Sequence, residues 1–538
     1  MRRARTLLLA ATTLALLLLA ASPIGAGAAA SQPAPRWLLH TQRFPGSISN
    51  GVRAMASAEA TAARARQLRV TASAAAPALQ NVQMNDDSDP PLPQDETSVA
   101  YSTQNPLVAV AGSNDYVSGG VAVMRTSDGG KSWKTTRVIP QFVGTRDFCS
   151  GGDPAVAYSR RDRAFYIAQL CFFRALPFSE VHLYKSVDNG KTWTPGRFAA
   201  RAASNFDYAN GTVDASLFYD KEYIDVDNTP TSPHYGRIYV TYTKFHLLAD
   251  GSSDTCPIQL AYTDDVPTFN PSLTVFQHTA VVPDDLGSGG LGESANQGSL
   301  PRVEPSGALD VTYTLEDCNT ALDHGFRFQK STDGGASFLA SPVHIDKPGQ
   351  FVDNPDPGDL LPPTAFRAPN NASLAVNRAT GTLAFVYQNN VNRAVSGADI
   401  SLQLSRDGGF HWTDARVLSK AGGAAAPNDQ FFPWIAATPS GEFNAIWFDR
   451  RRDPANRNID TWQAVSGDDG RSWRTFRIST RSWNPDLGFF TSGAFIGDYN
   501  GIAAANQAVY PVWTDGGNTA IARTGIGETD IFTNVELR

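Results

Sequence analysis

An eight-residue pattern recurs along this chain, and a repeat constrains the fold of a long sequence more than any single motif does. Each copy has Ser or Thr first, Asp third, Gly fifth and an aromatic residue last. The seventh residue is a second hydroxyl except in the fourth copy, where His411 takes its place. The copies are TSDGGKSW (126–133), SVDNGKTW (186–193), STDGGASF (331–338), SRDGGFHW (405–412) and SGDDGRSW (466–473).

Turn chemistry explains this pattern without a ligand. The Asp side chain accepts hydrogen bonds from nearby backbone N–H groups, the Gly adopts a positive φ, and the aromatic ring anchors the hairpin in the core. We therefore predict structural hairpin turns at Asp128, Asp188, Asp333, Asp407 and Asp468.

The spacing of the turns predicts a β-propeller. The five aspartates are 60, 145, 74 and 61 residues apart, and a degraded copy at 260–270 divides the long interval at Asp265. Short alternating runs rich in Val, Ile, Tyr and Phe indicate strands, and a four-stranded blade fits the period. Blade starts are DETSVAYS (95), GDPAVAYS (152), DKEYIDVD (220), SLPRVEPS (299), NASLAVNR (371), DQFFPWIAATPS (429) and GDYNGIAAA (497).

The expected fold class is therefore all-β, a single seven-bladed propeller over residues 81–538, with six blades as the alternative. The last unit is short by one strand. We expect residues 78–86 to supply that strand and close the ring, because closure removes the exposed strand edges.

The five turns resemble the Asp-box, or bacterial neuraminidase repeat, of sialidases and related β-propellers. The resemblance implies a sialidase-like, carbohydrate-active fold, in which three arginines clamp the sialic acid carboxylate and a Tyr–Glu pair acts with an Asp. The matching early strand here, DETSVAYST, contains no arginine, and three convergent arginines are not identified. Tyr499 and Glu222 are candidates for the Tyr–carboxylate pair. Asp-box turns also occur in propellers that have no sialidase activity.

The N-terminal region reads as an export signal and a leader. Residues 1–30 have a basic start, an apolar stretch and a small-residue end, which is typical of a secretory signal peptide. Residues 31–80 are rich in Ala, Arg and Ser, so we expect a flexible leader. No later stretch has the roughly 18 apolar residues of a membrane helix. We expect a secreted monomer with no membrane span.

Charge and motifs exclude several classes of function. The chain has 45 Lys plus Arg against 52 Asp plus Glu, which gives no support to nucleic-acid binding. A nucleophile elbow, a phosphate-binding loop and a His-rich zinc motif are all missing from the sequence, which disfavours esterases, nucleotide-binding proteins and metalloproteases. The expected partner is an extracellular glycan or glycoprotein.

Long connections gather on one face of the expected propeller, where binding residues usually lie. The four cysteines fall in these connections, and an even number in an exported chain favours disulfides. We pair Cys149 with Cys171 and Cys256 with Cys318, because each pair lies on neighbouring connections.

Residues that open the innermost strands are acidic and would surround the central channel. Asp95 and Glu96 open the first strand, and Asp220 and Glu222 share one face of another. Glycoside hydrolysis needs two carboxylates about 5–10 Å apart across a sugar, which this ring could supply. It could also bind calcium, or each Asp could cap its own strand. The catalytic candidates are Asp153, Asp220, Glu222, Asp429, Asp498 and Tyr499.

Candidate substrate-binding residues are two arginines and several aromatic residues in or beside the long connections. The flat rings either stack on a sugar or pack the loops. These candidates are Arg302, Arg450, Trp483, Phe432 and Phe489.

Two functions remain open. The first is a glycoside hydrolase that acts on extracellular glycans, and the second is a non-catalytic, calcium-stabilised propeller that binds a glycan or a protein. We expect no obligatory cofactor, and calcium is the candidate ligand.

Overall fold

The computed structural model of the 538-residue chain describes residues 34–44, 48–49, 51–55, 81–86, 92–143, 145, 147–355, 359–364, 366–487, 495–516 and 529–538. The expected signal peptide, residues 1–30, lies outside the described residues, as does the candidate Phe489. No helix in the described ranges is long and apolar enough to cross a membrane.

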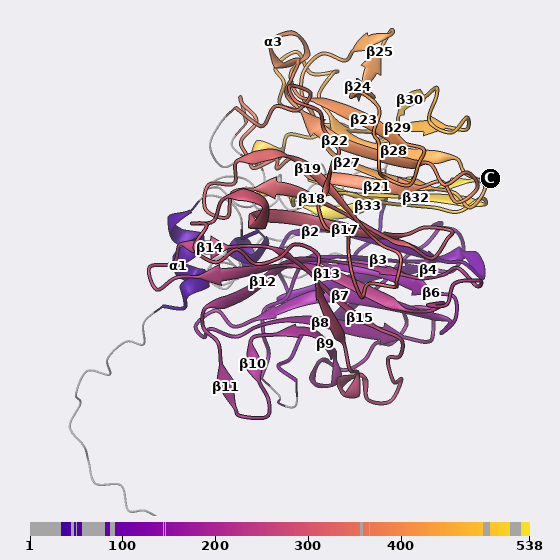
Figure 1. The fold of residues 1–538 in the computed structure, drawn as a ribbon. Coiled ribbons are helices and arrows are strands. Elements are labelled where there is room, and N and C mark those ends of the chain that lie inside the picture. The colour runs from indigo at the N-terminus through magenta and orange to yellow at the C-terminus, as the bar shows by residue number, and fades with distance from the viewer. Residues whose placement is uncertain are drawn as a thin grey trace, which may run out of the picture. The chain divides into compact units, whose positions relative to one another are not determined.

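The described strands form a seven-bladed β-propeller of antiparallel sheets, as the repeat predicts. Blade one consists of β2 (Gln94–Ser102), β3 (Asn105–Asp115), β4 (Gly120–Thr126) and β5 (Lys134–Val138). Blade two consists of β6 (Ala155–Ser159), β7 (Ala164–Phe172), β8 (Ser179–Ser186) and β9 (Ala200–Ser204). Blade three consists of β12 (Leu217–Val226), β13 (Ile238–Leu247), β15 (Ile258–Thr263) and β16 (Gln277–Ala280), and β14 (Ser253–Thr255) pairs with β13. Figure 1 shows the sheets following one another in chain order, from purple to yellow.

Blades four to seven follow the same plan. Blade four consists of β17 (Asn296–Val303), β18 (Leu309–Glu316), β19 (Asp323–Ser331) and β20 (Val343–His344), and blade five of β21 (Ala372–Val376), β22 (Leu383–Asn389), β23 (Asp399–Ser405) and β24 (Arg416–Val417). Blade six consists of β27 (Gln430–Ala437), β28 (Phe443–Asp449), β29 (Asp460–Ser466) and β30 (Arg474–Arg477). Blade seven consists of β31 (Gly501–Ala504), β32 (Ala508–Asp515), β33 (Asp530–Thr533) and the N-terminal β1 (Val82–Gln83), and β34 (Glu536–Leu537) pairs with β32.

The remaining elements are short and lie in connections. They are α3 (Arg393–Ser396), the 3-10 turns Gly196–Phe198, Pro271–Leu273, Gly292–Ser294 and Pro485–Leu487, and the two-stranded ribbons β10 (Phe206–Asp207) with β11 (Thr212–Val213) and β25 (Lys420–Ala421) with β26 (Ala424–Ala425).

The N-terminal strand closes the ring, which confirms the prediction for residues 78–86. Val82 and Gln83 of β1 pair with Thr533 and Phe532 of β33, the strand that otherwise forms the outer edge of blade seven. Buried Asn85 extends this closure, because its side chain donates to Asp530 Oδ1 at 2.7 Å and accepts from the backbone N–H of Ile531 at 2.8 Å. The first and last parts of the fold are therefore joined within one sheet.

The repeated turns have the chemistry that the sequence predicts. In the first of them, Asp128 accepts from Thr126 Oγ1 at 2.7 Å, from Ser132 Oγ at 2.6 Å and from the Ser132 backbone N–H at 3.1 Å. The same capping recurs at Asp188, Asp333, Asp407 and Asp468. Each turn joins the third and fourth strands of its blade.

The degraded copy at Asp265 differs from the five intact turns. Asp265 bonds to the Thr263 hydroxyl through its own backbone N–H and carbonyl, and not through its carboxylate. The expected aromatic anchor, Phe269, is fully exposed. Without the Gly and the carboxylate cap, this connection is therefore not built like the others.

The cysteine pairing is as predicted. Cys149 is bonded to Cys171, and Cys256 to Cys318. The first disulfide ties the connection before blade two to β7, and the second ties blade three to the connection after β18.

The expectation of a flexible leader over residues 31–80 is wrong for part of that range. Helix α1 (Arg36–Arg43) packs on blades two and three, where the Trp37 ring contacts those of Phe172 and Phe218 at 5.3 and 5.5 Å between centroids. His40 is bonded to the Gly251 carbonyl at 2.9 Å, and Figure 1 draws α1 next to β14. A few widely spaced apolar anchors hold this segment, although its average composition is that of a leader.

Asn85→Ala is expected to destabilise the closed ring, because it removes buried hydrogen bonds that join β33 to the N-terminal strand. The free energy of unfolding should fall by about 1–3 kcal/mol, measured by denaturant titration of the purified chain. The control is Asn210→Ala, whose side chain bonds only within an exposed turn. Equal stability of the two variants would contradict the role given to ring closure.

Candidate functional site

The inner strands bring six carboxylates together at one end of the central channel, and we call this group, with Lys221 and Tyr499, the acidic mouth. All six carboxylate residues are at most 2 % exposed. They are Asp95, Glu96, Asp153, Asp220, Glu222 and Asp498. Four of them, Asp153, Asp220, Glu222 and Asp498, are among the catalytic candidates of the sequence analysis.

Blade one holds its carboxylates by a shared amide. Asn114 Nδ2 donates to Glu96 Oε2 at 2.6 Å and to Asp95 Oδ1 at 3.1 Å, and Asn114 Oδ1 accepts from the Asp153 backbone N–H at 2.8 Å. Glu96 Oε1 in turn accepts from the backbone N–H of Asp498 at 3.2 Å. One network therefore joins blades one, two and seven across the mouth.

A recurring backbone irregularity aims these side chains inward. A β-bulge interrupts the first strand of a blade between Asp95 and Ser98, and again between Asp220 and Tyr223. Glu96, Asp153 and Lys221 have φ values of 56°, 53° and 52°, in the left-handed region. Each such non-glycine residue costs on the order of 1–3 kcal/mol, and strain of this kind clusters at functional sites. The bulges therefore mark the mouth as a candidate site.

Lys221 is the cation at the centre of the mouth. Its Nζ lies 4.0 Å from Asp153 Oδ2 and 3.5 Å from the centroid of the Tyr499 ring. Burial lowers the pKa of Lys221, but the carboxylates of Glu96 and Asp153 outweigh it and raise that pKa overall. Lys221 therefore stays protonated and partly offsets the surrounding negative charge.

Glu222 is the carboxyl group best suited to keep a proton. Burial, followed by the charges of Asp153 and Asp220, raises the pKa of Glu222 well above its ordinary value. Neither of its side-chain oxygens accepts a hydrogen bond from another described residue. Glu222 and Tyr499 line the same small cavity, together with Tyr223 and Trp434. Glu222 is thus a buried acid with a free hydroxyl to donate.

Four further groups in the mouth have shifted pKa values, and for two of them, Asp95 and Glu96, burial raises the pKa well above its ordinary value. Burial and the charge of Asp153 raise the pKa of Asp220 to about 7, although Ser49 donates a hydrogen bond to it. Burial, with the charges of Glu96 and Asp153, raises the pKa of Tyr499 well above its ordinary value, so its hydroxyl is neutral.

Residues 48–49 and 51–55 of the N-terminal segment, here called the closing segment, cover the mouth. The Ser49 backbone N–H donates to Asp220 Oδ2 at 2.6 Å. Gly51 lies so close that a Cβ there would be 2.7 Å from Asp153 Oδ1 and 2.8 Å from Glu96 Oε2. The flanking side chains of Ile48, Val52 and Met55 are at most 1 % exposed. The chain therefore blocks its own acidic mouth.

Asp429 and Arg450 do not join the mouth; they pair with each other. Arg450 Nη1 lies 3.4 Å from Asp429 Oδ2, and Asp429 also binds Arg393 at 3.1 Å. The Arg450 guanidinium stacks over Phe366 and Phe431. This fully buried pair fixes the connections around blade six.

The other predicted binding residues that the structure describes also lie away from the mouth. Arg302 lines a cavity of about 240 Å³ with Asp225 and Arg378, bounded by the opposite ends of the inner strands. Trp483 and Phe432 are packed in one buried apolar cluster, so they fill the core and do not present a ring to a sugar.

Sequence reasoning missed three residues that matter here. Lys221 lies between Asp220 and Glu222 in the sequence, and only these two acidic neighbours were predicted as site residues. Asn114 lies on a second strand, where no motif marks it. Arg367, in the long connection before β21, lies with its Nε 3.7 Å from Asp498 Oδ1, and nothing in the local sequence predicts that approach.

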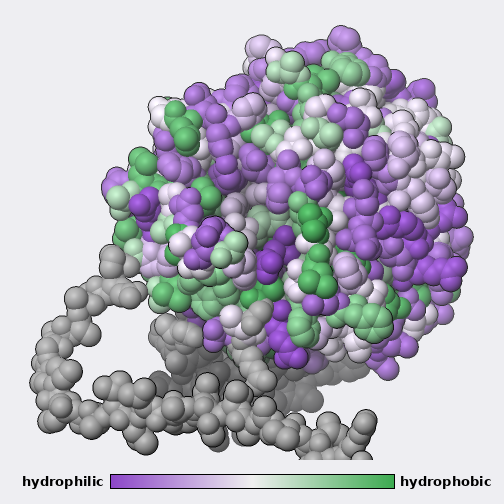
Figure 2. Space-filling view, turned by 60° about the horizontal axis from the view of Figure 1, so that its bottom comes forward, coloured by the Kyte–Doolittle hydropathy of each residue, from purple (hydrophilic) through white to green (hydrophobic). Residues whose placement is uncertain are grey.

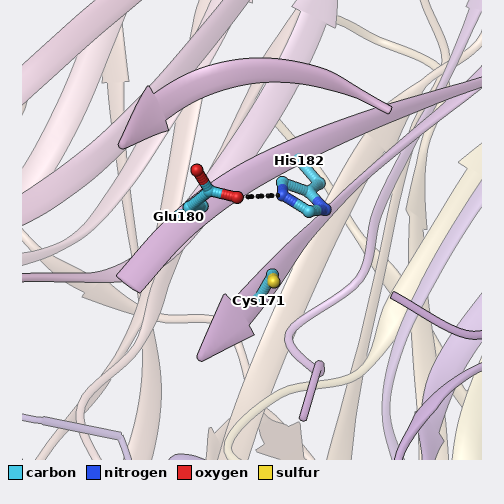
Figure 3. Close-up of side chains that lie close together, drawn as sticks. All are labelled: Cys171, Glu180 and His182. Carbon is cyan, nitrogen blue, oxygen red and sulfur yellow. Dashed lines mark hydrogen bonds and ion pairs between the residues drawn. The ribbon is translucent and has the colours of Figure 1, made fainter. Parts of the chain in front are cut away.

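A second group of potential metal ligands, in blade two, is not a metal site. Cys171, Glu180 and His182 lie close together, as Figure 3 shows. The Cys171 sulfur is bonded to Cys149 and is no thiolate. His182 Nε2 is 2.7 Å from Glu180 Oε2, and its Nδ1 is bonded to the Tyr184 hydroxyl. This group is a structural polar cluster.

No protein-family model and no curated protein matches the sequence. Similar solved structures include a Hadza microbial sialidase, 13% identical with a TM-score of 0.42 over 79% of this chain and 73% of that one. An α-L-arabinanase of Penicillium chrysogenum complexed with arabinobiose is 11% identical, with a TM-score of 0.41 over 71% and 92%. A sialidase of Trypanosoma rangeli is 12% identical, with a TM-score of 0.40 over 74% and 56%.

The raised pKa of Asp220 predicts a pH dependence of stability. The folded chain keeps this proton up to about pH 7, whereas the unfolded chain releases it near the ordinary value of 3.8. The contribution of Asp220 to stability is therefore present below that lower value and is lost as pH rises through 7. Asp220→Asn should flatten the fall of Tm between pH 4.5 and 8, measured by thermal melts.

The control for this prediction is Asp285→Asn, which changes an exposed aspartate. Its pH profile should match that of the unsubstituted chain. A profile of Asp220→Asn that is as steep as the control's would contradict the assignment of a raised pKa to Asp220.

Proposed function

We propose that this chain is a secreted, sialidase-like glycoside hydrolase of the propeller type, whose active site is the acidic mouth and whose closing segment keeps it latent. The observation that carries the proposal is Glu222, a buried carboxyl with a raised pKa and unpartnered oxygens, beside the carboxylate of Asp153 and the cation of Lys221. Paired titratable groups in contrasting environments are typical of acid and base assignments.

The proposed chemistry uses two carboxyl groups. Protonated Glu222 donates its proton to the glycosidic oxygen as the bond to the sugar breaks, and Asp153 faces the positive charge that develops on the ring. A water molecule then forms a bond to the anomeric carbon and gives a proton to the Glu222 carboxylate, which restores the acid. Neither Asp153 side-chain oxygen accepts a hydrogen bond from a described residue, and Lys221 Nζ lies 4.0 Å from Asp153 Oδ2. Tyr499 supplies a neutral hydroxyl next to Glu222.

The charge of the mouth favours a neutral glycan. A sialic acid carboxylate would meet six buried carboxylic residues, with no clamp of three arginines among the described residues to offset the repulsion. Trp434 lies 5.4 Å from Tyr223 and 5.7 Å from Tyr499 between ring centroids, but Trp434 and Tyr499 are as buried as Trp483, so the assignment is based on charge and not on these rings. We therefore assign neutral extracellular glycans as the substrate class.

Two observations support an extracellular setting. The described cysteines are paired in two disulfides, which persist in oxidising compartments. On the face drawn in Figure 2, polar residues predominate and apolar side chains form small separate groups, which suits an aqueous environment and a glycan partner. The proposed form is a monomer with no obligatory cofactor.

Gly51→Leu should open the latent enzyme. The new side chain would clash with Asp153 and Glu96, and overpacking of this kind costs about 1–3 kcal/mol. Displacement of the closing segment would then raise kcat/KM on a panel of fluorogenic glycosides by roughly 5- to 150-fold. Gly467→Leu is the matched control, because nothing lies within 4 Å of a Cβ at that position. Equal activity of the two variants would exclude latency.

Glu222→Gln in the Gly51→Leu background should lower kcat by about 10²- to 10⁴-fold, because the amide cannot protonate the leaving oxygen. The variant should keep the Tm of its parent, since the group it replaces is neutral when protonated. Glu536→Gln, at a half-exposed ion pair with Arg538, is the control and should keep full activity. Turnover that survives in Glu222→Gln would remove Glu222 from the mechanism. Silence of every variant across the panel would favour the glycan- or protein-binding propeller.

A further inference from the structure

A second acidic group lies beside the mouth, formed by a strand of blade four and the connection that follows this blade. We call it the loop cluster, and it consists of Asp323 at the start of β19 with Asp353 and Asp359 of the following connection. One carboxylate oxygen from each of the three lies within 4.8 Å of the others. Asp323 and Asp359 are buried and Asp353 is partly buried.

The loop cluster has more negative charge than its surroundings offset. Buried Glu316 stands next to it, at the end of β18. Arg367 is the buried cation at this place, with its Nε 3.4 Å from Asp359 Oδ2, and it is shared with Asp498 of the mouth. His324 is turned to Asp317 instead, at 3.1 Å. Four acidic side chains are thus grouped around one shared guanidinium.

Two buried oxygens at the loop cluster have no hydrogen-bond donor among the described residues. One is Asp323 Oδ1, and the other is Oδ1 of Asn370, a side chain that is 1 % exposed. The Asn370 amide lies within the cluster, because its Nδ2 donates to Asp323 Oδ2 at 3.0 Å and also to Asp353 Oδ1. Buried polar atoms are rarely left unpaired, since each costs about 1–3 kcal/mol. Because Asn370 faces the carboxylates through Nδ2, the unpaired oxygen that belongs to the cluster itself is Asp323 Oδ1, and this oxygen points to a missing positive partner.

We propose that the loop cluster binds one Ca²⁺ through Asp323, Asp353 and Asp359, with Asn370 Oδ1 as a further ligand after rotation of its amide. The donors are all hard oxygens, which calcium prefers and which do not suit zinc or copper. Their origin in a strand start and a long connection gives an irregular cage, which calcium accepts and the stricter octahedral demand of Mg²⁺ does not.

Calcium at this place would fasten the connection that carries Arg367. Asp353 already accepts from the backbone N–H of Asp323 at 3.0 Å, and Asn354 Nδ2 reaches the Ala368 carbonyl at 2.7 Å. A bound ion would join these two stretches and fix the guanidinium that lies between Asp359 and Asp498. The proposal stands on the loop cluster itself and does not require that the mouth be catalytic.

The test is binding of the metal alone to the full chain. Terbium luminescence, with Ca²⁺ and Mg²⁺ as competitors, should reveal a site that Ca²⁺ displaces at least 10-fold more effectively than Mg²⁺. Millimolar Ca²⁺ should raise the Tm of the chain after chelator treatment by several degrees. Asp353→Asn should lose at least 10-fold in terbium affinity and most of the Tm shift, whereas Asp285→Asn, at an exposed aspartate, should lose neither.

Three results would overturn the proposal. They are no terbium signal in the unsubstituted chain, no change of Tm with Ca²⁺, or equal binding by Asp353→Asn and Asp285→Asn. If Asp353→Asn fails to fold, the titration of the unsubstituted chain and the competition by Mg²⁺ still decide the matter. None of these readouts depends on glycoside turnover, so their failure is distinct from failure of the proposed activity.

Discussion

The attraction between Lys221 and the carboxylates around it is the interaction on which the mouth depends. Burial of six acidic side chains at one end of a channel is unfavourable unless charges are paired or protons are retained. Lys221 offsets part of the charge from a left-handed backbone position, 4.0 Å from Asp153. The pKa values of Asp95, Glu96, Asp220 and Glu222 are also raised, and Arg367 Nε lies 3.7 Å from Asp498 Oδ1. The same imbalance supplies the acid that glycoside chemistry needs.

The closing segment follows from the same electrostatics. A backbone N–H from Ser49 reaches Asp220, and Gly51 fits against Asp153 and Glu96 because it has no side chain. Apolar anchors on each side, Trp37 of α1 and Met55, hold the segment down without adding charge to the mouth. The fit of the segment depends on the missing side chain at Gly51, so a side chain at that position would oppose closure, as latency requires.

Local patterns were enough to predict the scaffold. The turn repeat and the alternating strands gave seven blades, the short last blade predicted closure by β1, and the cysteine positions predicted both disulfides, because each depends on contacts within a blade or between neighbours. Four of the predicted catalytic carboxylates meet at the mouth for a similar reason: they lie at or near the starts of the inner strands of blades two, three and seven.

What the sequence could not predict depends on long-range packing. Arg302 lies toward the opposite end of the channel, and Asp429 forms an ion pair with Arg450. Neither arrangement could be predicted from the spacing of nearby residues. Arg367 approaches Asp498 from a connection more than a hundred residues earlier. The leader predicted over residues 31–80 contains packed segments that its average composition hides, because single anchors such as Trp37 and Ile48 hold them.

The measurement that tests the central claim most directly is glycoside hydrolysis before and after the chain is cut between the closing segment and β1. A specific protease site inserted within residues 56–80 allows the fold to form intact before cleavage. The account predicts that turnover of a neutral glycoside rises after the cut and that Glu222→Gln abolishes the rise. Turnover that is equal before and after the cut, or absent in both states, would contradict it.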